Sequence, residues 1–213
     1  MSHKPNLTSD PIARLLFKMT LPVMGGIVAL MLFNLVDAYF IAQLGTEALA
    51  AVTFTFPVTF TLISLSIGLG IGTSAVVGRL LGQQAHELVR RRTTDSALLA
   101  IVLSILLTIL GWLTLEPLFR LLGVTDDLMP YIRDYMQIWY LGTLFVVFPR
   151  AISSALRASG NTLVPGLAMI ASAVLNGLLD PLLIFGWGPI PAMGVQGAAL
   201  ATLVSWMLLT VVI

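Results

Sequence analysis

The chain has 213 residues, of which 58% are hydrophobic and only 10% carry a charged side chain. Soluble domains carry about 25% charged residues, so this composition, with a mean hydropathy of +0.99, excludes a water-soluble globular protein and indicates a membrane protein. The net charge is +1, and the absence of cysteine excludes disulfides and thiol chemistry. We therefore expect membrane lipid around the chain and no nucleic-acid partner.

Six apolar segments are each long enough to cross a membrane, which takes about 20 residues. Inside lipid the backbone polar groups must be paired within the segment, so segments of this length are helices. The sequence therefore predicts an all-α protein with six transmembrane helices. In chain order they are Leu15–Leu44, Ala50–Leu81, Ser96–Leu118, Tyr131–Ala155, Leu163–Phe185 and Gly194–Ile213.

The first predicted helix carries an acid within the apolar run. Asp37 lies seven residues before Leu44, which places it about 10 Å below the membrane surface. Asn34 precedes it by three residues and shares its face. An ionised carboxylate in hydrocarbon costs at least ~3 kcal/mol, so it needs a counter-charge or a water-filled cavity. Pro22 predicts a kink nearer the start of this helix.

The next three predicted helices contain fewer candidate functional residues. The second is longer than lipid requires and contains Pro57, which predicts another kink. A polar loop is expected over residues 82–95. Tyr135 lies about one turn below the start of the fourth helix, in the same half of the membrane as Asp37.

The fifth helix carries the second intramembrane acid. Asp180 lies five residues before Phe185, and Asn176 precedes it by one helical turn on the same face. Pro181 has no N–H, so the carbonyl of Gly177 loses its helical partner. A free carbonyl beside a carboxylate is a typical ligand set for a hard cation, although a simple proline kink explains the same pattern.

The sixth helix completes a possible polar layer. Thr202 lies about 12 Å inside the membrane if the helix enters near Gly194. The spans contain no deep Lys or Arg to neutralise the two acids. The counter-charge is then a proton, a metal cation such as Na⁺ or a cationic substrate, unless hydroxyl and amide donors alone hold the acids. The layer would contain Asp37, Tyr135, Asn176, Asp180 and Thr202.

The positive charges predict the orientation, because Lys and Arg favour the cytoplasmic side. With a cytoplasmic N-terminus, the inner flanks hold Lys4, Arg14, Lys18, Arg79, Arg90, Arg91, Arg92, Arg150 and Arg157, and the outer flanks hold only Arg120 and Arg133. Both termini are then cytoplasmic. The chain ends inside its sixth apolar run without a polar cap, so we expect a missing second half; a natural short C-terminus is the alternative.

Together the motifs resemble the N-terminal lobe of the multidrug and toxic compound extrusion (MATE) family over essentially the whole chain. The matching residues are Leu21-Pro22 and Asn34-Leu-Val-Asp37 in the first helix, Gly78-Arg79 with Gly82-Gln83, Leu156 to Thr162 with Pro165, Leu175-Asn176 with Leu179-Asp180-Pro181, and Gly194-Val195, Gly197-Ala198-Ala199 and Ala201-Thr202.

The resemblance implies a twelve-helix exporter of the inner (plasma) membrane rather than an enzyme. Its two lobes would face a cleft that exports cationic or amphipathic drugs in exchange for Na⁺ or H⁺, with no cofactor beyond this coupling ion. By residue match the ion would bind to Asp37, Asn176 and Asp180, assisted by Thr202, the Ala198 carbonyl, Tyr135 and Asn34, with bending of the helices near Pro22 and Pro181. The C-terminal lobe, or a second copy, would be the missing partner.

Two other functions fit a membrane bundle. A flippase for lipid-linked sugars shares the two-lobe plan, but such flippases line their cleft with basic residues, and the spans contain no deep base. A scaffold or assembly protein fits the short length, but it would not need two costly buried acids.

Overall fold

A computed structural model describes residues 11–213 and shows an all-α bundle, as the sequence predicts. Among the described residues, five helices are apolar and long enough to cross a membrane, and there are six such spans if the bent pair of α4 and α5 is counted as one. Lys4, one of the bases that set the predicted orientation, lies outside the described residues. The helices are α1 (Ile12–Ala42), α2 (Thr46–Gly82), α3 (His86–Leu121), α4 (Met129–Leu141), α5 (Thr143–Ala158), α6 (Leu163–Ile184) and α7 (Val195–Val212).

The predicted fourth helix, Tyr131–Ala155, is a pair of helices that meet at Gly142 with a bend of 42°. The Thr108 hydroxyl of α3 donates a hydrogen bond of 2.9 Å to the Tyr140 carbonyl in the last turn of α4. A Cβ at position 142 would lie 3.0 Å from the Leu203 side chain of α7. The break thus lies where α3 and α7 contact the chain, and the local sequence does not reveal these contacts.

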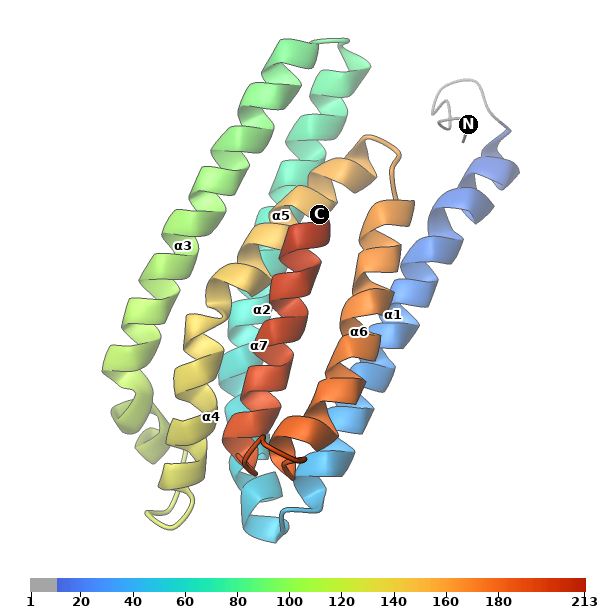
Figure 1. The fold of residues 1–213 in the computed structure, drawn as a ribbon. Coiled ribbons are helices and arrows are strands. Elements are labelled where there is room, and N and C mark those ends of the chain that lie inside the picture. The colour runs from blue at the N-terminus through green and yellow to red at the C-terminus, as the bar shows by residue number, and fades with distance from the viewer. Residues whose placement is uncertain (1–10) are drawn as a thin grey trace.

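The predicted loop over residues 82–95 is much shorter, because α3 begins at His86. The turn closes when the Ala85 N–H donates to the Leu80 carbonyl and the Gln84 N–H donates to Leu81, with Gln84 in the left-handed region at φ 57°. At 37 and 36 residues, α2 and α3 are each about 55 Å long. Their turn therefore extends beyond the other helices (Figure 1).

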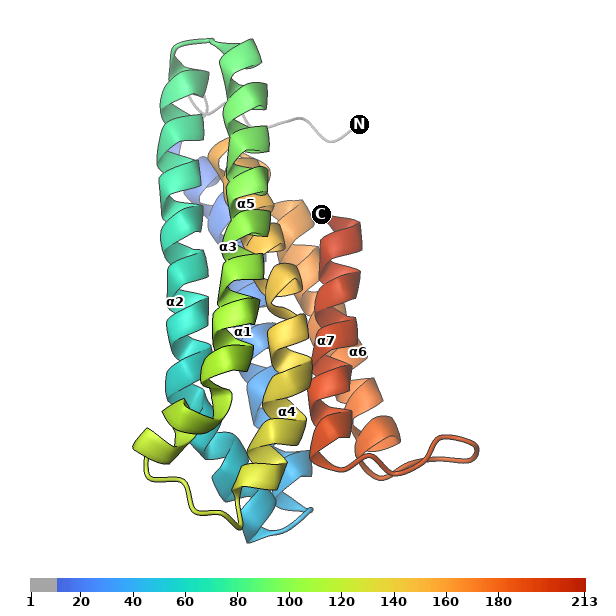
Figure 2. The same cartoon turned by 90° about the vertical axis from the view of Figure 1, so that its left-hand side faces the viewer.

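Two groups of helices make up the bundle. α1 packs mainly along α6, and α6 packs against α7, whereas α2, α3 and α5 pack together. The beginning of α1 and the end of α7 lie toward the same end of the bundle (Figure 1), and Figure 2 shows the α6–α7 loop extending sideways at the opposite end. α1 keeps an exposed apolar side, which includes Phe17, Met31 and Leu35, available to lipid or to another lobe.

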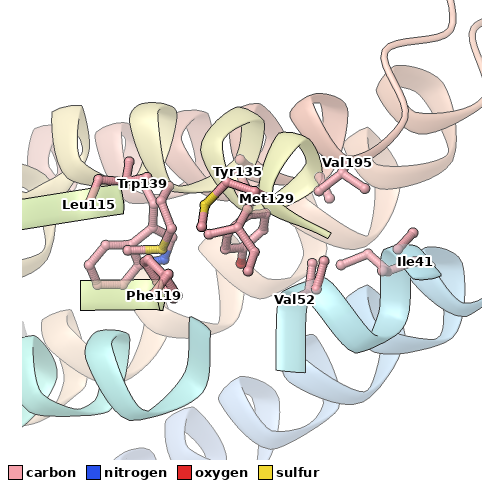
Figure 3. Packing of buried hydrophobic residues seen from close by; sticks show 14 of the residues in the cluster. Ile41, Val52, Leu115, Phe119, Met129, Tyr135, Trp139 and Val195 are labelled. Carbon is pink, nitrogen blue, oxygen red and sulfur yellow. The ribbon is translucent and has the colours of Figure 1, made fainter. Parts of the chain in front are cut away.

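The largest buried apolar cluster of the described residues lies where α1, α2, α3, α4, α6 and α7 meet, at the end opposite the α2–α3 turn. Ile41 lies in the last turn of α1, Val52 in the second turn of α2, Phe119 in the last turn of α3 and Val195 at the start of α7, and these residues cluster with Tyr135 of α4. Figure 3 shows these side chains converging. This packing fixes the ends of the helices that carry the acids.

Candidate functional site

The junction between α6 and α7 places the polar residues of these two helices opposite each other. The Met193 N–H donates to the Leu183 carbonyl at 3.0 Å, and the Gly194 N–H donates to Ile184 at 3.1 Å. Gly197 lies directly against the Leu183 backbone, where a Cβ would overlap the carbonyl. Small residues permit such close approach of membrane helices, so the beginning of α7 is fixed against the end of α6.

Three side chains of α6 and α7 form a buried polar cluster. The Asn176 amide nitrogen lies 3.2 Å from Asp180 Oδ1 and 3.5 Å from the Thr202 hydroxyl oxygen. Asn176 and Asp180 have no exposed surface, and Thr202 is 3% exposed. Because Asn176 donates through its nitrogen, its carbonyl oxygen stays available as a ligand.

The cluster and Asp37 of α1 leave three buried oxygens without a hydrogen-bond donor. Within the described residues, Asp37 Oδ1, Asn176 Oδ1 and Asp180 Oδ2 accept no hydrogen bond. The charges of Asp37 and Asp180 act on each other and on the buried Tyr135 hydroxyl of α4. An unsatisfied buried acceptor costs about 1–3 kcal/mol, so the arrangement favours uptake of a positive species.

Neither acid is neutralised by a base in the described part of the chain. There the ion pairs join Arg92 to Asp95, Arg120 to Asp126 and Arg133 to Glu116, all on exposed side chains. No three His, Cys, Asp or Glu side chains gather within residues 11–213. The available ligands are therefore two carboxylates completed by amide and hydroxyl oxygens, a set that suits a hard cation or a proton.

The residues predicted to support the ion site differ in their burial. Tyr135 is 7% exposed and Ala198 is fully buried, one turn before Thr202, so its carbonyl is directed along α7 toward that residue. Asn34 is instead exposed, and its amide donates to the Leu30 carbonyl at 3.0 Å. Asn34 is thus not brought to the carboxylates.

The two prolines lie inside continuous helices. α1 runs through Pro22, and α6 runs through Pro181 as far as Ile184. At Pro22, α1 approaches α6 closely, since a Cβ on Gly166 of α6 would lie 2.5 Å from the Pro22 carbonyl oxygen. Bending at these positions remains a prediction.

The structure shows the surroundings of one basic residue that the sequence assigned to a flank. The sequence places Arg150 in a cytoplasmic flank and leaves the spans without a deep base. In the structure Arg150 lies eight residues before the end of α5, is half-buried and lines a cavity with Phe33 and Trp206. The structure thus adds that Arg150 is partly buried beside a cavity, and its depth in the membrane stays a prediction. The spacing of seven between Arg150 and Arg157, which puts both on one helix face, was the available signal.

Comparison with known proteins identifies the family. The MatE family model matches residues 22–182. The FAD transporter of Shewanella oneidensis is 45% identical over 207 residues, which cover 97% of this chain and 46% of the relative. Multidrug export protein MepA of Staphylococcus aureus is 26% identical over 197 residues, or 92% of this chain and 43% of the relative. The chain thus spans less than half the length of these relatives.

Solved structures agree with this match. A crystal structure of MATE in the bent conformation has a TM-score of 0.86 and 32% identity, covering 94% of this chain and 44% of that chain. The outward-facing conformation of a multidrug resistance MATE family transporter also has a TM-score of 0.86 and 32% identity, covering 93% and 43%. Because the family model covers most of the chain and the fold agrees, this multi-pass membrane protein belongs to the MatE family of transporters.

Proposed function

We propose that the chain supplies the N-terminal lobe of an ion-coupled small-molecule exporter, with the coupling ion bound between Asp37 and Asp180. One observation carries this proposal. Two acids in membrane-spanning helices leave buried oxygens unpaired while the ion pairs of the described residues lie elsewhere. Intramembrane acids of this kind mark ion pathways.

The pocket can couple ion binding to helix position. With the site empty, the two negative charges repel, and a bound Na⁺ or proton removes this repulsion. Asp37 is on α1 and Asp180 is on α6, the helices that pack closely at Pro22 and Gly166. Ion occupancy therefore biases the position of α1 against α6, which is how a ligand shifts a conformational equilibrium.

Two cargo classes follow from the relatives. Amphipathic or cationic drugs are the first, because several relatives are named multidrug export proteins. Flavin adenine dinucleotide (FAD) is the second, and the 45% identity to an FAD transporter over 97% of this chain favours it. Arg150, which is partly buried beside a cavity, is a base that a phosphate-bearing cargo would contact.

Transport by alternating access needs two bodies that move around a shared site. This chain spans under half of its relatives, and α1 has an exposed apolar side. We therefore propose that a second six-helix lobe, or a second copy, completes the transporter.

Na⁺-induced proton release tests the site. Na⁺ is added to the purified chain in weakly buffered detergent with a pH-sensitive dye. Protons should be released because both ions compete for the same carboxylates, and the apparent Na⁺ affinity should fall as the pH is lowered. The Asp37→Asn and Asp180→Asn variants should lose this release, whereas Asp126→Asn, on an exposed ion pair, should retain it.

Two other outcomes of this experiment would change the assignment of the site. Equal proton release by the wild type and by both Asn variants would place the coupling site elsewhere. No Na⁺ effect at any pH, together with a pH-dependent change in tryptophan fluorescence that needs Asp37 and Asp180, would assign the site to protons alone.

A further inference from the structure

Two arginines of α5 border two cavities in the described part of the lobe. A cavity of about 130 Å³ lies between α1, α5, α6 and α7, and a second of about 240 Å³ lies between α2 and α5. Arg150 and Arg157 line both of them. Their positive charges act on each other, so the two guanidinium groups form one local positive centre.

No carboxylate balances this centre among the described residues. The ion pairs there use Arg92, Arg120 and Arg133, and the bond shown for Arg157 is a donation of 2.8 Å to the Ser154 hydroxyl. Two half-buried guanidinium groups that repel each other are stabilised when an anion binds between them. The planar guanidinium fork matches phosphate oxygens bidentately.

Aromatic and hydroxyl side chains surround the arginines. Phe33, Phe145 and Trp206 line the smaller cavity, and Ser66 and Ser74 line the larger one. Aromatic faces stack against flat rings, and hydroxyls donate hydrogen bonds to anionic oxygens. The lining therefore suits a ligand that joins a planar ring to phosphate.

The smaller of the two cavities, between α1, α5, α6 and α7, lies about one helical turn from the cation pocket on three of these helices. Phe33 precedes Asp37 by four residues on α1, and Trp206 follows Thr202 by four on α7. On α6, Ala173 precedes Asn176 by three. Each interval is about 4.5–6 Å, so the same three helices contact both sites.

We propose that Arg150 and Arg157 bind the phosphate groups of a nucleotide cargo whose ring packs against Trp206. This inference rests on the proposed export function and names the class of its cargo. It assigns the cargo site to the face of α5 between the two cavities, adjacent to the ion pocket. Movement of α1, which borders both sites, would link ion binding to cargo binding.

Ligand discrimination tests the proposal. The chain is placed in nanodiscs of zwitterionic lipid, and quenching of tryptophan fluorescence is titrated with FAD and with riboflavin, which lacks phosphate. FAD should bind at least about tenfold more tightly, because a hydrogen bond to a charged group contributes at least that much. Arg150→Gln and Arg157→Gln should each remove most of this difference while riboflavin binding stays unchanged.

Two controls keep the result interpretable. Arg90→Gln removes the same charge from an exposed position on α3 and should bind FAD as the wild type does. Arg150→Lys tests folding, since it keeps the charge and should retain part of the preference for FAD.

Other results would overturn the proposal. Equal affinities for FAD and riboflavin, or an FAD preference that survives both Gln variants, would exclude a phosphate site at these arginines. Loss of FAD binding in nanodiscs with phosphatidylglycerol would assign the arginines to a lipid headgroup instead. If Na⁺ releases protons but FAD is not preferred over riboflavin, only this inference is refuted. If FAD is preferred but Na⁺ releases no protons, only the coupling proposal is refuted.

Discussion

At the scale of single residues, the site depends on a shortage of hydrogen-bond donors. Asn176 provides its amide to Asp180 and Thr202, and nothing in the described residues donates to the second oxygen of Asp180 or to Oδ1 of Asp37. A structural role for these acids would predict paired oxygens, as seen for most buried polar groups. The unpaired carboxylate oxygens are therefore the reason why we propose a ligand of positive charge here.

Replacement of Thr202 by Val tests the contribution of the neutral oxygens. The substitution keeps the side-chain shape but removes the hydroxyl that accepts from Asn176, so the affinity for Na⁺ should fall about tenfold, the usual effect of a lost supporting group. Thr210→Val is the matched control, because its hydroxyl donates only to the Trp206 carbonyl of its own helix. Equal affinities in the two variants would argue against a role for Thr202.

Local spacing predicts some of these residues and not others. The interval of four between Asn176 and Asp180 places them on one face, and the structure pairs them. The approach of Thr202 depends on the α6–α7 junction, which no pattern within either helix specifies. Spacing can also mislead. Asn34 lies three residues before Asp37, which predicts a shared face, but in the structure Asn34 is exposed.

At the scale of helices, close packing at Gly197 aligns α7, which carries Thr202, with α6, which carries Asn176 and Asp180. Gly197 of α7 lies on the Leu183 backbone of α6, and the adjacent loop donates to the last carbonyls of α6. The spans themselves were predictable from hydropathy. The break at Gly142 and the early beginning of α3 were not, since both depend on contacts with other helices or on helix outside the membrane.

The Gly197→Ala variant tests this alignment. The added methyl group would overlap the Leu183 carbonyl, so α7 must shift, at a typical overpacking cost of about 1–3 kcal/mol. The thermal unfolding temperature and the affinity for Na⁺ should both fall. Gly72→Ala on α2 meets nothing within 4 Å and should leave both unchanged or raise the unfolding temperature slightly. A Gly197→Ala variant as stable as this control would contradict the close contact.

At the scale of the whole molecule, the proposed ion site lies between α1 and the α6–α7 pair, and the proposed cargo site lies beside it on α5. The exposed apolar side of α1 lies on the outside of this arrangement. A bundle of six crossings brings the beginning of α1 and the end of α7 to the same end, as Figure 1 shows. The excess of Lys and Arg predicts that this end faces the cytoplasm.

Single-cysteine labelling checks this orientation, since the chain has no cysteine of its own. Gln43→Cys lies between α1 and α2, and Gln83→Cys lies between α2 and α3; both positions are exposed. In intact cells a membrane-impermeant maleimide should label the Gln43 variant and should reach the Gln83 variant only after the membrane is permeabilised. The reversed pattern would invert the orientation.

Infrared difference spectroscopy of the purified chain tests the central claim most directly, because it observes the carboxyl groups themselves. Addition of Na⁺ should remove a protonated-carboxyl band from the spectrum and add carboxylate bands, and the band should be missing in Asp37→Asn or Asp180→Asn. A spectrum in which neither Na⁺ nor a change of pH alters any carboxyl band, or in which both variants retain the full change, would contradict an ion site shared by these two residues.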